Sequence, residues 1–378
     1  MSYWGNATVN RLNLHYFIHA LASNAGGVFL AVYLLRAGVP VPGVLGSIAA
    51  IVGGRFVIRP FLLGFGVRFG LRPLVISGTV LGAAQYPLLA LVHGVGGPLY
   101  ALIATGSFSD TIYWTCYHAY FASLGDARHR GHQIGAREAM AAAASIAGPL
   151  AGGFGLARLD PRLVFGLVAV VQLLSALPLL GAPNVAVQPG LTGSYRAAWR
   201  GVLLFACDGW ISAAHNFVWP LALFVSLGRS FSIFGGALAL ASTAGALSGL
   251  LLGRRIDAGH GGRAAWLVCG GQAVITLACA ASTGHPEGAV LANAARAMVA
   301  VVYILTLMTS VYNQAKRAPC SLRFHIATEG GWDAGCGLGC LCAAALTLAG
   351  VGLADAVLIA LPGIFAALAL LRRYYKAN

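Results

Sequence analysis

Carboxylate side chains are scarce in this sequence, and several lie inside or beside long apolar stretches. Asp208 and Asp110 each stand alone in such a stretch, whereas Glu329 and Asp333 are four residues apart. A spacing of four places two side chains on one face of a helix, where neighbouring carboxylates can share a proton. We therefore predict that these four residues and Glu138 carry protons. Glu329 is equally suited to an ion pair with a nearby arginine.

Arginine side chains also occur inside the apolar stretches. Arg55 lies about twelve residues into one of them, which is a depth of roughly 18 Å at 1.5 Å per helical residue. A guanidinium at that depth needs a counter-ion or an anionic ligand, because lipid does not solvate charge. Arg59, one turn further along, is expected to reach the membrane surface, and Arg296 lies in a later stretch. These arginines favour a ligand with anionic character.

Imidazole, amide and aromatic side chains in the same stretches complete a predicted binding site. Histidine and asparagine can hydrogen-bond a solute, and tryptophan and tyrosine can line its path. The predicted substrate-binding residues are Arg55, Arg296, His15, His19, Asn24, His215, Asn216, Trp210 and Tyr117.

Two pairs of potential metal ligands suggest an alternative. His15 and His19 are four residues apart, and so are Cys336 and Cys340. Imidazole and thiolate ligands suit transition metals such as Cu, Fe or Zn. Each pair needs further ligands from other helices, and a buried histidine bonded to a carbonyl is the competing interpretation. The chain has only four methionines, so it lacks the thioether ligands expected for monovalent copper.

The composition indicates what must position these residues. Of the 378 residues, 58% are hydrophobic and 9% are charged, against about 25% charged in soluble domains. A membrane-spanning helix needs roughly 20 apolar residues. We expect twelve spans, because the chain divides into apolar stretches near residues 12–36, 43–66, 73–93, 97–122, 133–156, 162–182, 199–226, 231–253, 264–283, 287–310, 325–350 and 354–372.

The positive charges lie at the ends of these stretches and predict the orientation. With both termini in the cytoplasm, 17 Arg and Lys residues fall on the cytoplasmic side and 4 on the other. Cytoplasmic loops carry such an excess. We predict a monomeric, multi-pass protein of the bacterial inner membrane with a small-molecule or ion substrate. The net charge of +14 is distributed along these loops, so it does not indicate nucleic-acid binding.

The two halves of the chain resemble each other. A shift of about 190 residues aligns Gly38 with Gly228, and a shift of 191 aligns Glu138 with Glu329. Parallel repeats of this kind are common in transporters. The expected organisation is an N-terminal bundle at 1–182, a cytoplasmic linker at 183–199 and a C-terminal bundle at 200–378.

The loops after the second and eighth stretches resemble the signature of the major facilitator superfamily. That signature reads Gly, three residues, Asp, Arg, any residue, Gly and then basic residues. In the first copy, Leu63 replaces the glycine and Val67 replaces the aspartate, and the second copy is shifted in register. The resemblance implies that these loops latch the two halves in one state. The residues that carry it are Arg68, Gly70, Arg72, Gly253, Asp257 and Arg263.

The resemblance also implies the fold and the mode of action. The family has two six-helix bundles related by a pseudo-two-fold axis along the membrane normal, and its members are secondary transporters that work by alternating access. We expect no enzymatic activity, because the sequence has no nucleophile motif or phosphate loop, and no cofactor; the carboxylates predict protons as the coupling ion. The fifth span contains Gly148, Pro149, Gly152 and Gly153, which are similar to a motif of exporters and equally suit a packing seam with a proline kink.

Overall fold

A computed structural model describes residues 7–124, 130–187, 194–256, 261–318 and 321–377. The chain divides into two compact units. The N-unit comprises Met1–Gly38 and Gly54–Gly190, and the C-unit comprises Val39–Gly53 and Leu191–Asn378. The described residues form helices joined by short loops and contain no strand. The predicted all-α fold is therefore confirmed, while the predicted domain limits stay a prediction.

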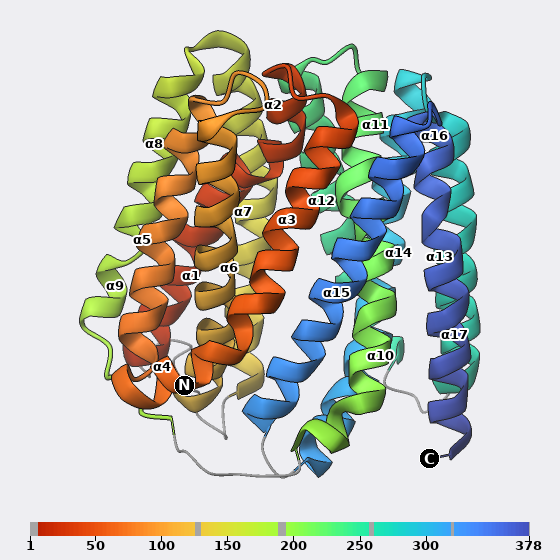
Figure 1. The fold of residues 1–378 in the computed structure, drawn as a ribbon. Coiled ribbons are helices and arrows are strands. Elements are labelled where there is room, and N and C mark those ends of the chain that lie inside the picture. The colour runs from red at the N-terminus through yellow and green to blue at the C-terminus, as the bar shows by residue number, and fades with distance from the viewer. Residues whose placement is uncertain (1–6, 125–129, 188–193, 257–260, 319–320, 378) are drawn as a thin grey trace. The chain divides into compact units, whose positions relative to one another are not determined.

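The first half of the chain forms six membrane-crossing segments, three of them interrupted. The first breaks at η1, beside Gly26, where an added Cβ would lie 2.7 Å from the ring of Tyr86. The segments are α1 (Ala7–Ala25) with η1 (Gly27–Phe29) and α2 (Leu30–Arg36), α3 (Val41–Ile58) with η2 (Arg59–Phe61) and α4 (Leu62–Phe69), α5 (Leu71–Ala90), α6 (Gly97–Leu124), α7 (Arg130–Arg158), and α8 (Pro161–Leu174) with α9 (Leu177–Leu180) (Figure 1).

The second half repeats this pattern with six further segments. The first of them contains a π-helical turn, η3, between two α-helices. The segments are α10 (Ser194–Ser212) with η3 (Ala213–Val218) and α11 (Trp219–Ser226), α12 (Phe231–Ile256), α13 (Gly261–Ser282), α14 (Pro286–Arg317), α15 (Ser321–Leu348), and α16 (Leu353–Ala356) with η4 (Val357–Ile359) and α17 (Ala360–Ala377) (Figure 1).

Ten of the twelve segments are long and apolar enough to cross a membrane, counted over the described residues. The other two are α6 and the segment from α10 to α11. Helix α6 carries Ser107, Ser109 and Thr111, all of which are buried. Polar side chains in a span are tolerated when they face protein and not lipid. The prediction of twelve spans agrees with the helical segments observed.

The repeat is visible in the backbone at two pairs of loop glycines. Gly38 and Gly228 have φ angles of 90° and 66°, and Gly94 and Gly284 have φ angles of 102° and 87°. The members of each pair are 190 residues apart. Positive φ favours glycine because a Cβ would clash with the neighbouring carbonyl. The same turn therefore ends the corresponding segment in each half.

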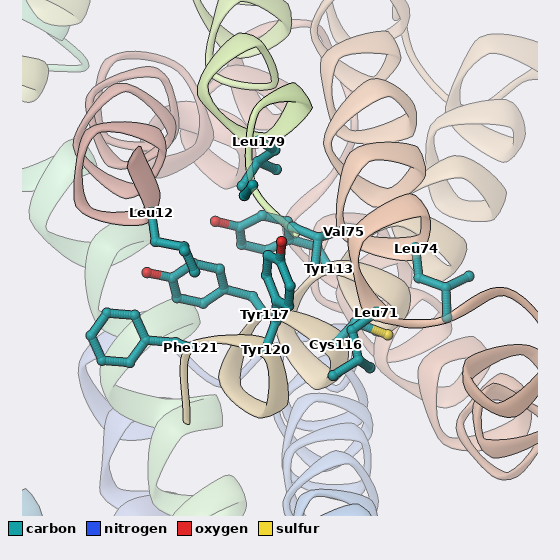
Figure 2. Close-up of a cluster of buried hydrophobic side chains, with 11 residues drawn as sticks. Leu12, Leu71, Leu74, Val75, Tyr113, Cys116, Tyr117, Tyr120, Phe121 and Leu179 are labelled. Carbon is teal, nitrogen blue, oxygen red and sulfur yellow. The ribbon is translucent and has the colours of Figure 1, made fainter. Parts of the chain in front are cut away.

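A cluster of aromatic and aliphatic side chains forms part of the N-unit core (Figure 2). Tyr117 and Tyr120 of α6 are fully buried, and Leu12 of α1 lies against them. Burial of such side chains against each other orders the helices that carry the polar residues described below. The cluster consists of Leu12, Leu71, Leu74, Val75, Tyr113, Cys116, Tyr117, Tyr120, Phe121, Leu179 and Ala182.

Glycines allow close helix crossings at corresponding places in both units. On α7, an added Cβ at Gly148 would lie 2.5 Å from Cβ of Asn24, and one at Gly152 would overlap the carbonyl oxygen of Ala25 on α1. In the C-unit, a Cβ at Gly335 of α15 would overlap a backbone carbonyl of α10. Small residues permit such approach between membrane helices. The glycine motif of the fifth span is thus a packing seam, and its link to export stays a prediction.

Candidate functional site

His15 of α1 is held by two hydrogen bonds inside the N-unit. Its Nδ1 lies 2.6 Å from the carbonyl oxygen of Ser175, and its Nε2 lies 3.0 Å from the hydroxyl of Tyr113. A carbonyl oxygen only accepts hydrogen bonds, so Nδ1 of His15 carries the proton and Nε2 accepts from the tyrosine. The ring is fully buried. Its tautomer and orientation are therefore fixed by neighbouring helices.

His19, one turn further along α1, is fixed in the same network. The side-chain amide of Gln172 donates to Nδ1 of His19 at 2.8 Å, and Oγ of Ser23 lies 3.4 Å from Nε2. The ring stacks on Tyr113 with a centroid distance of 3.9 Å. The two predicted histidines thus contact Tyr113 of α6 and Gln172 of α8.

This network bears on the predicted metal site. All four ring nitrogens of His15 and His19 lie against protein partners, so a metal ion would have to displace them. Cys336 and Cys340 are buried within α15 of the C-unit. Within the described ranges, no group of three or more His, Cys, Asp or Glu residues could hold a metal ion. The competing interpretation, histidines bonded to a carbonyl and to neighbouring side chains, describes what is observed.

A cation lies against the aromatic cluster of the N-unit. The guanidinium of Arg137 lies 5.4 Å from the ring centroid of Tyr16 and 4.9 Å from that of Phe121. It also forms a salt bridge to Glu138 at 2.5 Å. Tyr117 stacks on Tyr16 at 5.2 Å and is fully buried. The structure therefore places Glu138 in an ion pair, with 59% of its side chain exposed.

Asp110 and the arginines of the second span have polar neighbours in the N-unit. The amide of Gln85 lies 3.5 Å from Oδ1 of Asp110, and the Ser109 hydroxyl lies 3.3 Å from it. Arg59 is 2% exposed and donates to Thr115 at 2.9 Å. The head group of Arg59 thus bonds to α6, and its reach to the membrane surface stays a prediction. Arg55, at the other end of that helical turn, is half-buried.

Two predicted binding residues donate hydrogen bonds to backbone carbonyls of their own unit. Asn24 donates to the carbonyl of Ala20 at 2.8 Å, one turn before the break in α1. Trp210 donates its indole N–H to the carbonyl of Ile359 at 2.6 Å. Asn216 lies in the π turn with its side chain exposed. These three stay predictions as solute contacts, and the structure assigns the first two a hydrogen bond to backbone.

Three of the predicted proton carriers lie along the packed helices α10 and α15 of the C-unit (Figure 1). The Trp332 indole donates to Oδ2 of Asp208 at 3.1 Å. The Tyr303 hydroxyl lies near the same carboxylate without the geometry of a hydrogen bond. Glu329 is within electrostatic range of Asp208, and Asp333 follows one turn later with 1% exposure. Facing helices therefore bring these carboxylates to one region of the unit.

A second polar group lies elsewhere in the C-unit. His215, in the π turn, lies 2.9 Å from the hydroxyl of Thr276, through Nε2. Arg296 of α14 lies within electrostatic range of His215 and forms no ion pair with a described residue. Gln272, one turn before Thr276 on α13, is 2% exposed. The predicted residues His215 and Arg296 thus share a region with two polar residues that were not predicted from the sequence.

The loop residues of the family signature are only partly described. Arg72 donates its backbone N–H to Oδ1 of Asn184 at 3.1 Å and its side chain to the carbonyl of Ala182 at 2.8 Å. Gly70 has a φ of 78° at the start of α5, and Arg68 lies over the ring of Phe69. Of the remaining signature positions, Gly253 lies in α12. Asp257 and the side chain of Arg263 lie outside the described residues.

The site residues that sequence reasoning missed are mainly uncharged. Gln172, Ser175 and Thr276 all lie in apolar stretches and are fully buried. Amides are less conspicuous than charges, although a buried amide also needs hydrogen-bond partners. Gln172 and Gln272 each interrupt a run of small and apolar residues, and this was the available signal.

Comparisons with known proteins agree with the architecture. The model of the Major Facilitator Superfamily matches residues 12–323. The crystal structure of the POT family transporter PepTSo is similar, with a TM-score of 0.74, 12% identity and coverage of 99% of both chains. A bacterial homologue of the iron transporter ferroportin, in its inward-facing state, has a TM-score of 0.72, 14% identity and coverage of 98% of both chains.

The crystal structure of the nucleoside transporter NupG has a TM-score of 0.68, 15% identity and coverage of 98% of both chains. A comparison with curated proteins found no match. At these identities the solved structures show the fold alone, whereas the family model covers most of the chain. The chain therefore belongs to the Major Facilitator Superfamily and is a transporter, not an enzyme.

Proposed function

We propose that this chain is a proton-coupled secondary transporter of a small solute with anionic character. The observation that carries the proposal is Asp208, which lies in a membrane-crossing segment and forms no ion pair with a described residue. Its carboxylate is held by Trp332 and lies within electrostatic range of Glu329. A carboxylate inside a span is costly while ionised, and binding a proton removes that cost.

The placement of these carboxylates suits exchange of protons during transport. Asp208 belongs to α10 and Glu329 belongs to α15, so a small displacement of one helix against the other alters the distance between the two charges. A second negative charge disfavours ionisation of the first, and the effect depends strongly on distance. Helix movement in the C-unit and proton binding at Asp208 are thereby linked.

The anionic character of the solute rests on two half-buried cations. Arg296 lies in a membrane-crossing helix and forms no ion pair with any residue that the structure describes. Guanidinium groups in spans usually pair with acids or mark a substrate path. Arg55 in α3 is the corresponding candidate of the N-unit. We propose export as the direction, on the likeness of the fifth-span motif to that of exporters.

The proposal is tested in proteoliposomes that contain the purified chain and a trapped pH-sensitive dye. A panel of dicarboxylates and other organic anions is added at constant external pH, and proton flux is recorded. We expect Asp208→Asn to abolish solute-driven proton flux while solute exchange between equal concentrations on both sides persists. Asp355→Asn is the matched control, because Asp355 is an exposed acid of the same unit. Wild-type proton flux in Asp208→Asn would refute the assignment.

A further inference from the structure

The π turn η3 interrupts the seventh membrane-crossing segment and aims His215 into the C-unit. His215 is 4% exposed, and Trp219, one turn later, is fully buried. Single π-helical turns inside α-helices occur frequently at functional sites, because the extra residue redirects a side chain. The turn therefore marks the surroundings of His215 and Trp219 as a candidate site.

Helix α14 contacts this segment through Asn293 and carries Arg296 one turn further along. Trp219 donates its indole N–H to Oδ1 of Asn293 at 3.0 Å, and the Asn293 amide donates to the carbonyl of Ala237 at 3.2 Å. Arg296 lies three residues after Asn293, on the same face of the helix. His215 lies four residues before Trp219, and it is within electrostatic range of Arg296.

The hydrogen bonds of Thr276 fix the tautomer of a neutral His215. The threonine hydroxyl donates to the carbonyl of Gln272 at 2.7 Å, which uses its only proton. It can then only accept from the imidazole, so Nε2 of His215 donates at 2.9 Å. In the neutral ring Nδ1 is left as an acceptor. Protonation would turn it into a second donor beside Arg296.

Helix α13 adds a face of buried polar groups. Gln272, Thr276 and Cys279 are spaced by four and three residues, and each is at most 2% exposed. This helix packs along α14, and Cys279 lies within electrostatic range of Arg296. Two polar atoms there have no hydrogen-bond partner among the described residues, Nε of Arg296 and Oε1 of Gln272. A half-turn of the Gln272 amide would present its two N–H donors in place of the oxygen.

The corresponding helices of the two halves differ in how their charged residue is paired. Tyr86 and Thr276 are 190 residues apart, so α5 and α13 correspond, as do α6 and α14. In the N-unit, α6 carries Asp110, and the Gln85 amide and the Ser109 hydroxyl lie beside its carboxylate. The charge of the first copy thus has donors within the protein. The second copy carries a cation, Arg296, with no acid beside it among the described residues.

We propose that Arg296 and Gln272 form a binding site for a single anionic group within the C-unit, beside His215. The guanidinium supplies the opposite charge, and Gln272 supplies an amide donor. The shared chemistry is a small monovalent anion, delivered as a carboxylate of the solute or as free chloride. Only the carboxylate source rests on the proposed function, since chloride binding is independent of proton coupling at Asp208.

The test measures binding of chloride and acetate to the detergent-purified full chain. Chloride binding is followed by broadening of the ³⁵Cl resonance, and thermal unfolding is followed in chloride, acetate and the bulky reference anion isethionate at equal ionic strength. A ligand that binds the folded state raises its unfolding temperature in a saturable manner. We expect saturable stabilisation by chloride, acetate or both, and its loss in Arg296→Gln. Arg373→Gln, an exposed arginine of the same unit, retains it.

A second variant keeps the test decisive if Arg296→Gln does not fold. Gln272→Leu removes a buried amide whose oxygen has no partner among the described residues, so without anion its unfolding temperature stays equal or rises. We expect its anion affinity to fall about tenfold, as for one lost hydrogen bond to a charge. A merely structural role for Gln272 predicts lower stability and unchanged affinity, which would overturn the proposal.

The outcomes identify the source of the anion and separate anion binding from proton coupling. Chloride binding that acetate does not displace identifies free halide, and stabilisation by acetate alone identifies the solute carboxylate. Asp208→Asn should bind the anion as wild type does, so loss of proton coupling and loss of anion binding are measured independently. Absence of saturable binding by both anions would refute the site.

Discussion

The indole of Trp332 on α15 donates a hydrogen bond to Oδ2 of Asp208 on α10 across 3.1 Å. The contact joins two helices of the C-unit that pack along each other. It gives the carboxylate a donor but no counter-charge. A carboxylate held in this way keeps its position while its protonation changes, which is what a proton carrier requires.

Replacing Trp332 by phenylalanine tests this contact without removing the aromatic ring. The variant loses the donor to Asp208, and a hydrogen bond to a charged group contributes on the order of 2 kcal/mol. We expect solute-driven proton flux in proteoliposomes to fall about thirtyfold, because each 1.4 kcal/mol is a factor of ten. Trp199→Phe is the control, because Trp199 is 59% exposed and should show wild-type flux. Equal flux in both variants would speak against a role for the indole.

Tyr113→Phe tests the histidine network of the N-unit. The substitution removes the hydroxyl that donates to Nε2 of His15 and keeps the ring that stacks on His19. A buried acceptor left without a donor costs about 1–3 kcal/mol. We expect the free energy of unfolding in detergent to fall by that amount, measured by denaturant titration. Tyr100→Phe, at a position 60% exposed, should leave it unchanged.

The close crossing of α7 and α1 predicts that alanine lowers the unfolding temperature at one glycine and not at another. Gly152→Ala would force a methyl group onto the carbonyl of Ala25, whereas Gly166 of α8 has nothing within 4 Å of an added Cβ. Alanine is favoured over glycine inside a helix by up to about 1 kcal/mol. Gly152→Ala should therefore unfold at a markedly lower temperature, and Gly166→Ala should match or exceed wild type. Tolerance of alanine at both positions would show that the seam can open.

Metal binding provides a direct test of the histidine pair. Because the ring nitrogens of His15 and His19 lie against protein partners, we expect no saturable binding of Zn²⁺ to the purified chain by calorimetry. The double substitution of both histidines by alanine should lower thermal stability without changing the titration. One equivalent of bound Zn²⁺ that disappears in the double variant would restore the metal hypothesis.

The spans could be predicted from the sequence because lipid places the same demand on each of them. Every backbone group must be bonded within the helix and most side chains must be apolar, so each crossing leaves a local pattern. The loop glycines could also be predicted from local sequence. Gly38 and Gly228 need positive φ for the turn itself, and that need is local.

The pairing of polar residues could not be predicted in the same way. Asp208 was selected because a charge inside a span is rare, but its partner Trp332 has many possible roles in a membrane helix. Gln172 and Gln272 were missed because an amide reveals its role only through what it faces. Glu138 was selected by position alone, and the structure pairs it with the adjacent Arg137.

The sequence by itself determined that the chain is a twelve-span helical membrane protein with two related halves, since hydropathy and repeated turns are properties of local segments. Only the tertiary structure decided that His15 and His19 bond to α6 and α8, and that Arg296 lies within electrostatic range of His215 without an acid beside it among the described residues. These relationships depend on which face each helix turns toward its neighbours. Helices in lipid choose those faces by close packing and interhelical hydrogen bonds, which join residues far apart in sequence.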